Sequence, residues 1–103
     1  MIICIKEKSL IARVAALLMR EKRIAIVFGN TIHLWNASKG ELIQNKTWLQ
    51  HELVHVEQFK KYGYIKFILM YTWELLKKGY YKNKFEVEAR AKEHQNILPH
   101  YIH

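Results

Sequence analysis

Residues 47–62 read TWLQHELVHVEQFKKY, and this stretch predicts the central helix of the fold. Neither proline nor glycine interrupts it before Gly63, so a helix from Trp48 to Tyr62 can run for about four turns. Thr47 followed by Gln50 fits a capping box at its start. Hydrophobic side chains occur around much of its circumference, which is typical of a helix that passes through the middle of a small domain.

The same stretch contains the motif His51-Glu52-Leu53-Val54-His55, in which two histidines are four residues apart. Residues four apart on a helix face the same side, so both imidazoles can bind one zinc ion at roughly 2.0–2.1 Å. Glu52 lies beside them, where a carboxylate can accept a proton from a zinc-bound water. The His and Glu content of the chain gives roughly 0.03 chance matches to this pattern. The motif therefore predicts a zinc-dependent hydrolytic site with Glu52 as general base.

A zinc site of this kind needs a third protein ligand, and the chain contains no aspartate. An aspartate ligand is therefore excluded. The longer motif with a glycine and a third histidine is excluded as well, because Gln58 and Lys61 occupy those positions. A downstream glutamate or a distant histidine remains.

Residues 83–93, NKFEVEARAKE, predict a second helix with Asn83 at its N-cap, and they contain the best candidates for the third ligand. Glu86 and Glu88 are about 200° apart on such a helix, so only one of them can face the metal. A glutamate three residues after Asn83 can also simply cap the helix. Glu88, Glu93 and the histidines stay open as alternatives to Glu86.

HELVH at 51–55 and FEVEARA at 85–91 together resemble the gluzincin metallopeptidases, whose third zinc ligand is a glutamate on a second helix. A chain of 103 residues most resembles the minigluzincins, which are small soluble prokaryotic proteins similar to the catalytic cores of integral-membrane metallopeptidases. The resemblance covers residues 24–94. It implies Zn²⁺ bound by His51, His55 and Glu86, with Glu52 as general base and a peptide or protein as substrate.

The chain departs from the larger gluzincins at one position. There, the ligand glutamate is followed by a small residue and then by an aspartate that supports a zinc-binding histidine. Here Ala89 matches the small residue, but Arg90 occupies the aspartate position. Another acceptor, such as a backbone carbonyl, must then orient that histidine. The oxyanion of the reaction also needs a donor besides zinc, for which Tyr62, Tyr80 and Tyr81 are candidates.

The remaining sequence predicts an α+β fold, a minimal zincin-like catalytic domain with a small hairpin sheet packed against about four helices. Its other expected elements are a helix from Leu10 to Arg20 capped by Ser9, strands at Arg23–Phe28 and Thr31–Trp35 joined by Gly29-Asn30, a helix at Ile65–Lys78 and a loop at Gly79–Lys82. By the same resemblance, Thr31–Asn36 is expected to be the edge strand that pairs with substrate. His33 in that strand is expected to pack against its neighbours.

The length allows one domain, residues 1–103. The single cysteine, Cys4, excludes an internal disulfide and favours a reducing, cytoplasmic location. The apolar start ends at Lys6, so no signal peptide is expected, and the apolar run 67–73 is too short to cross a bilayer. Pro99 ends the last helix, and residues 95–103 form a candidate latency segment. By resemblance to minigluzincin zymogens, this segment would fold over the cleft and occupy the open zinc position.

The net charge of +8 comes from lysines that cluster along the second half of the chain. The simplest interpretation is a solvated face, and lysine richness is also typical of thermophilic proteins. The helix at Tyr64–Leu76 is a candidate for weak contact with a membrane surface.

Two rival functions are a zinc-binding protein without peptidase activity and a basic nucleic-acid-binding module. No nucleic-acid-binding motif is present, so no nucleic-acid partner is expected.

Overall fold

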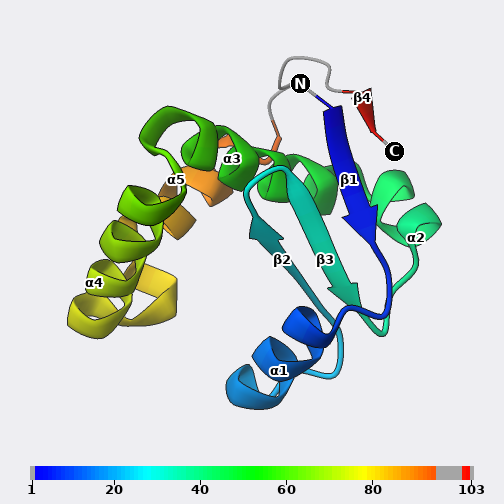
Figure 1. The fold of residues 1–103 in the computed structure, drawn as a ribbon, viewed down its shortest axis with the longest axis horizontal. Coiled ribbons are helices and arrows are strands. Elements are labelled where there is room, and N and C mark those ends of the chain that lie inside the picture. Colours follow the sequence, from blue (N-terminus) through cyan, green and yellow to red (C-terminus); the bar gives the residue numbers. More distant parts are fainter. Residues whose placement is uncertain (1, 95–100, 103) are drawn as a thin grey trace.

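The computed structural model describes residues 2–94 and 101–102. These residues form the expected α+β fold, in which a small sheet packs against helices (Figure 1). In chain order the elements are β1 (Ile2–Lys6), α1 (Leu10–Met19), β2 (Ile24–Phe28), β3 (Thr31–Trp35), α2 (Lys39–Gln44), α3 (Lys46–Tyr62), α4 (Tyr64–Lys82), α5 (Lys84–Lys92) and β4 (Tyr101–Ile102).

The sheet has the strand order β2-β3-β1-β4. Strands β2 and β3 form the predicted antiparallel hairpin around Gly29, whose φ of +64° suits a residue without a side chain. The sequence did not predict β1, which pairs in parallel with β3, with Cys4 opposite Thr31. The prediction that Thr31–Asn36 is an edge strand is therefore wrong. It lies between two strands, and among the described residues β2 is the edge beside α3 (Figure 1).

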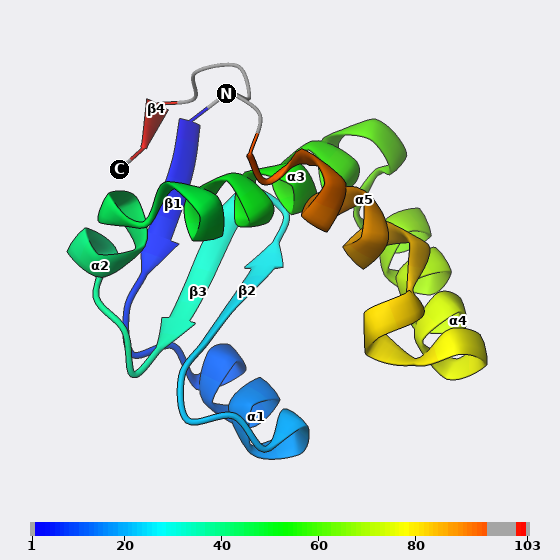
Figure 2. The same ribbon diagram turned by 180° about the vertical axis from the view of Figure 1, so that it is seen from behind.

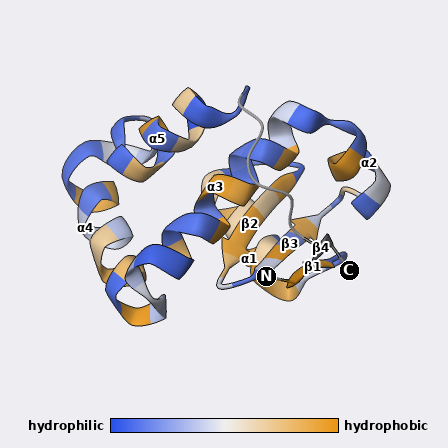
Figure 3. Cartoon of the chain, turned by 90° about the horizontal axis from the view of Figure 1, so that it is seen from above, coloured by the Kyte–Doolittle hydropathy of each residue, from blue (hydrophilic) through white to orange (hydrophobic). Residues whose placement is uncertain are grey.

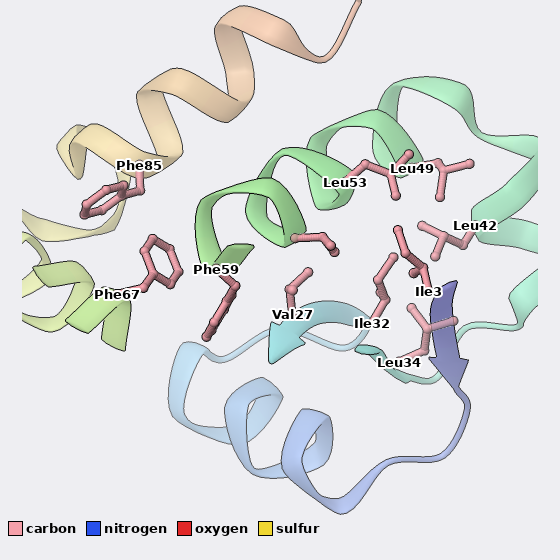
Figure 4. Packing of buried hydrophobic residues seen from close by; sticks show 11 residues of the cluster. Ile3, Val27, Ile32, Leu34, Leu42, Leu49, Leu53, Phe59, Phe67 and Phe85 are labelled. Carbon is pink, nitrogen blue, oxygen red and sulfur yellow. The ribbon is translucent and has the colours of Figure 1, made fainter. Parts of the chain in front are cut away.

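The two faces of the sheet are covered by different helices. Ile32 and Leu34 of β3 point toward α3 and α2, where they join the main core (Figure 4). His33, between them, points to the opposite face, where α1 packs through Ala12 and Ala16. Figure 3 shows the strands largely in the hydrophobic colour, whereas α3 alternates between polar and apolar residues. Strand β3 is thus covered on both faces, and α3 has one side available for polar chemistry.

The start of α3 differs from the prediction. Asn45, rather than Thr47, is the N-cap, and its side chain accepts a hydrogen bond from the Trp48 amide at 3.1 Å. Asparagine is a stronger cap than threonine, and Asn45 is placed here because the preceding helix α2 ends at Gln44. Ser38 and Glu41 form a capping box at the start of α2. Helix α3 therefore begins earlier than expected.

Helices α4 and α5 form a second layer against α3, away from the sheet (Figures 1 and 2). Phe67 of α4 joins them, with its ring 4.5 Å from that of Phe59 and 4.9 Å from that of Phe85. Helix α4 continues into the predicted loop at 79–82, but Gly79 (φ 79°, ψ 175°) breaks its helical conformation. Among the described residues, no helix combines the length and hydrophobicity that crossing a bilayer requires.

Candidate metal centre

Three side chains from two helices converge on one point. His51 and His55 project from the same side of α3, and Glu86 projects toward them from the first turn of α5. Oxygen Oε1 of Glu86 lies 3.0 Å from Nε2 of His51 and 3.2 Å from Nε2 of His55. The three residues predicted as ligands are thus brought together. Packing of α5 along α3 is what places the glutamate beside the histidines.

The spacing of these donor atoms suits a zinc ion. Three donors held tetrahedrally at the usual zinc distances are about 3.3 Å from one another. The donors of His51, His55 and Glu86 all lie within 4.8 Å of each other, and the Glu86 oxygen is close to that separation from both histidines. Two imidazole nitrogens and a carboxylate oxygen form a common zinc ligand set.

Both histidines are oriented by acceptors on the other ring nitrogen. Nδ1 of His51 lies 3.0 Å from Oε2 of Glu93, and Nδ1 of His55 lies 2.8 Å from Oε1 of Gln58. Gln58 in turn donates from Nε2 to Oε1 of Glu88 at 2.7 Å and to the Phe85 carbonyl at 3.0 Å. Donation from Nδ1 leaves Nε2 to face a metal, as in carboxylate–histidine–metal arrangements.

Glu93 supplies the acceptor that the sequence lacked at position 90. It is the C-cap residue of α5 and comes seven residues, about two turns, after Glu86, so both side chains face the same side of the helix. The sequence analysis considered Glu93 only as an alternative metal ligand. Glu88, the other glutamate considered, accepts a hydrogen bond from Gln58 instead. The spacing of Glu86 and Glu93 was the one signal that could have identified this role.

Glu52 lies next to His51 on α3 but is not among the three convergent donors. Its side chain is buried, with 6% of its surface exposed, and it lines a cavity together with His55 and Glu86. Burial raises the pKa of Glu52 to about 7, against the opposing effect of the two histidines. A carboxyl group with such a pKa can both accept and return a proton near neutrality.

The histidines and carboxylates of the site shift one another's pKa values. Burial would raise the pKa of Glu86, but hydrogen bonds from His51, His55 and Tyr71 hold it well below its usual range. Burial would likewise lower the pKa of His51, but Glu86, Glu52 and Glu93 raise it to about 9. The same balance raises the pKa of His55. The carboxylates thus create a site that attracts a cation.

The tyrosines divide into different environments. Tyr71 of α4, which the sequence did not single out, donates from its hydroxyl to Oε2 of Glu86 at 2.6 Å. Tyr80 borders the same cavity as Glu52. Tyr62 packs within the aromatic cluster beside Phe85, and Tyr81 is 72% exposed. Of the three predicted candidates for an oxyanion donor, the structure brings Tyr80 alone to the cavity that holds Glu52.

The cavity has a volume of about 330 Å³ and extends between β2 and α4. All five residues of β2 border it on one side. On the other side it is bordered by apolar and aromatic residues that include Phe67 and Ile68. An edge strand and an apolar recess therefore lie directly beside Glu52.

His33 is buried and its Nδ1 lies 2.8 Å from the Ser9 hydroxyl, so it packs within the fold as expected and lies outside the convergent donors.

Most of the candidate latency segment 95–103 lies outside the described residues. Its described backbone, Tyr101–Ile102, pairs with β1, at the opposite end of the strand order from β2. Latency therefore stays a prediction.

Comparisons with protein-family models, curated proteins and solved structures found no match to this chain. The resemblance to the minigluzincins stays a prediction.

Proposed function

We propose that this protein is a zinc-dependent metallopeptidase of the gluzincin type, with His51, His55 and Glu86 as metal ligands. The observation that carries the proposal is the convergence of Glu86 Oε1 on both histidine Nε2 atoms, with the buried carboxyl group of Glu52 beside them as a fourth residue. Metal binding alone would need only the three ligands. The position of Glu52 beside the cavity favours hydrolysis over simple zinc storage.

A zinc ion bound by these residues would polarise a peptide carbonyl and acidify a water molecule. Glu52 would accept the proton of that water and return it to the amine that leaves. The hydroxyl of Tyr80 borders the same cavity and can donate to the oxygen on which charge develops. Tyr71 would hold the second oxygen of Glu86 and keep the ligand carboxylate in place.

The substrate would be a peptide or protein segment in an extended conformation. Strand β2 has a neighbour on one side within the described sheet, and it borders the cavity along its whole length. Main-chain hydrogen bonds to such an edge bind extended peptides with little regard to sequence. Selectivity would then come from an apolar side chain placed between Phe67 and Ile68 in the recess.

The substitution Glu52→Gln tests this proposal. It should leave zinc binding unchanged and lower peptide hydrolysis by about 10²–10⁴-fold, because the general base is lost. The matched control is Glu57→Gln on the same helix, which should retain activity. A broad set of fluorogenic peptides is the appropriate substrate, assayed with and without a chelator. Zinc binding with equal hydrolysis in Glu52→Gln would contradict the assigned mechanism, and zinc binding without hydrolysis in any form would favour the non-enzymatic rival.

The assay should include protein trimmed after Leu98. If the C-terminal segment keeps the protein latent, as the resemblance implies, trimming should increase the hydrolysis rate. An unchanged rate would count against latency and leave the zinc-site proposal untouched.

A further inference from the structure

Helix α4 is apolar on two opposite faces. Its inner face packs on α3 and α5 through residues such as Phe67 and Met70. Its outer face, on the opposite side, is formed by four exposed side chains at helical spacing: Ile65 (76% exposed), Leu69 (65%), Trp73 (62%) and Leu76 (78%). A helix that is hydrophobic around its whole circumference is normally covered on every side.

The outer face of α4 carries no acidic residue. The sequence from residue 64 to residue 76 contains two charged residues, Lys66 and Glu74. Glu74 is buried on the inner side, where it accepts a hydrogen bond from the Lys84 amide and pairs with Lys78. The outer face is therefore apolar, and its nearest exposed charge is a lysine.

Lysines outnumber acidic residues in and around this helix. Between residues 60 and 84 the chain has a single glutamate and seven exposed lysines: Lys60, Lys61, Lys66, Lys77, Lys78, Lys82 and Lys84. The ammonium group of Lys77 lies over the Trp73 ring at 5.3 Å, so its aliphatic chain extends the apolar surface while its charge remains at the edge. The segment thus combines an apolar stripe with a basic border.

We propose that the outer face of α4 binds the surface of a membrane that contains anionic lipid. Apolar side chains would enter the region between headgroups and acyl chains, and the lysines would contact negative headgroups. Trp73 lies in the middle of the stripe, and tryptophan is the residue that interfaces prefer. The basic border decides against self-association as the occupant, because a second copy would bring like charges together.

The inner side of α4 borders the cavity of the candidate metal centre through Ile68 and Tyr71. A helix that lies on the bilayer would therefore hold the cleft close to the membrane surface. This inference concerns location and does not require hydrolytic activity, so it stands or fails separately from the proposed function.

The experiment is co-sedimentation of the full chain with phospholipid vesicles. Binding should be strong with vesicles that contain about 30% phosphatidylserine, much weaker with pure phosphatidylcholine, and reduced by about 0.5 M salt. The double substitution Leu69→Ser and Leu76→Ser should lower the partition coefficient by roughly tenfold or more. Emission from Trp73 should shift to the blue on binding, and Trp73→Phe should remove that shift.

Helix α1 provides the matched control. It exposes Leu17 and Leu18 to a similar degree (71% and 80%), but Arg13 is the one charged residue within it, and the segment that follows mixes acidic and basic residues: Arg20, Glu21, Lys22 and Arg23. The double substitution Leu17→Ser and Leu18→Ser should leave vesicle binding unchanged. Equal loss in both double variants, equal binding to neutral vesicles, or no binding by the wild type would overturn the proposal. A dimer in sedimentation velocity that only the α4 variant dissociates would also overturn it.

Discussion

Oxygen Oε2 of Glu93 lies 3.0 Å from Nδ1 of His51, the ring nitrogen that does not face Glu86. In the larger gluzincins that the sequence resembles, an aspartate at the position of Arg90 has this supporting role. The Arg90 guanidinium instead packs over the Tyr81 ring at 4.0 Å, and the carboxylate comes from the next turn of α5. The acceptor thus comes three positions later in the sequence than in the larger gluzincins, and it can still orient the His51 ring in the same way.

Removing this acceptor should weaken metal binding without unfolding the protein. We expect Glu93→Ala to lower zinc affinity by about 10–100-fold, because the His51 ring loses the partner that fixes its orientation. Competition with a chromophoric chelator measures the affinity. Glu7→Ala, at the turn before α1, is the control and should bind zinc like the wild type. Equal affinity in both variants would show that Glu93 does not support the site.

The two adjacent tyrosines at the end of α4 should behave differently. Tyr80 borders the cavity and Tyr81 does not, so Tyr80→Phe should lower kcat by about 10–10³-fold and Tyr81→Phe should leave it unchanged. Zinc affinity should stay the same in both variants. A loss shared equally by the two variants would indicate a structural effect of this segment rather than stabilisation of an oxyanion.

Zinc affinity should rise with pH between 6.5 and about 9. The pKa of His51 is raised from 6.5 to about 9, so over this range the metal-free protein holds a proton that zinc must displace. Each displaced proton increases the apparent affinity about tenfold per pH unit until the ring is deprotonated. Competition titrations at several pH values measure this slope. A flat profile across this range would mean that His51 is already neutral.

Stability of the metal-free protein should depend on pH in the corresponding way. Because the folded pKa of His51 is raised, its contribution is fully present below pH 6.5 and is lost as the pH rises through about 9. Glu86, whose folded pKa is lowered, contributes above pH 4.5 and loses that contribution as the pH falls. The melting temperature of the metal-free protein should therefore be highest at a pH where both contributions are present. Bound zinc should remove the decline on the alkaline side.

The two faces of α4 should also differ in unfolding experiments. Phe67 is buried between Phe59 and Phe85, so Phe67→Ala should lower the free energy of unfolding by about 3–5 kcal/mol. Leu69→Ala, on the exposed outer face, should change it by less than about 0.5 kcal/mol. Urea denaturation of the zinc-bound protein provides the comparison. A large effect of Leu69→Ala would mean that the outer face is covered within the protein itself.

Much of the fold could be predicted because its signals are local. Ser9 and Asn83 cap helices as expected, and Gly29 marks the hairpin turn. Strand β1 could not be predicted, because residues 2–6 form a short apolar run that periodicity does not assign and that pairs with a strand distant in sequence. The edge-strand expectation for β3, which came from the resemblance, is wrong because β1 occupies that edge.

The site, too, combines features that local spacing predicts with features that depend on tertiary packing. The four-residue spacing of the histidines follows from helical geometry, and it placed both on one side of α3. Gln58 lies three residues after His55 on α3, so helical spacing could have identified it as an acceptor. Tyr71 reaches the site only because α4 packs against α3 and α5, and no spacing within the sequence marks it. The choice between Glu86 and Glu88 likewise depends on how α5 is rotated against α3, which its sequence alone leaves open.

The most direct test of the zinc site is elemental analysis of bound metal in the purified wild type, Glu86→Ala and Glu88→Ala. The structure predicts one zinc per chain in the wild type and in Glu88→Ala, and a loss of zinc in Glu86→Ala, because Glu86 contacts both histidines whereas Glu88 contacts Gln58. A wild-type protein that binds no zinc even after zinc is added would contradict the central claim. Zinc retained in Glu86→Ala would contradict the assignment of the third ligand.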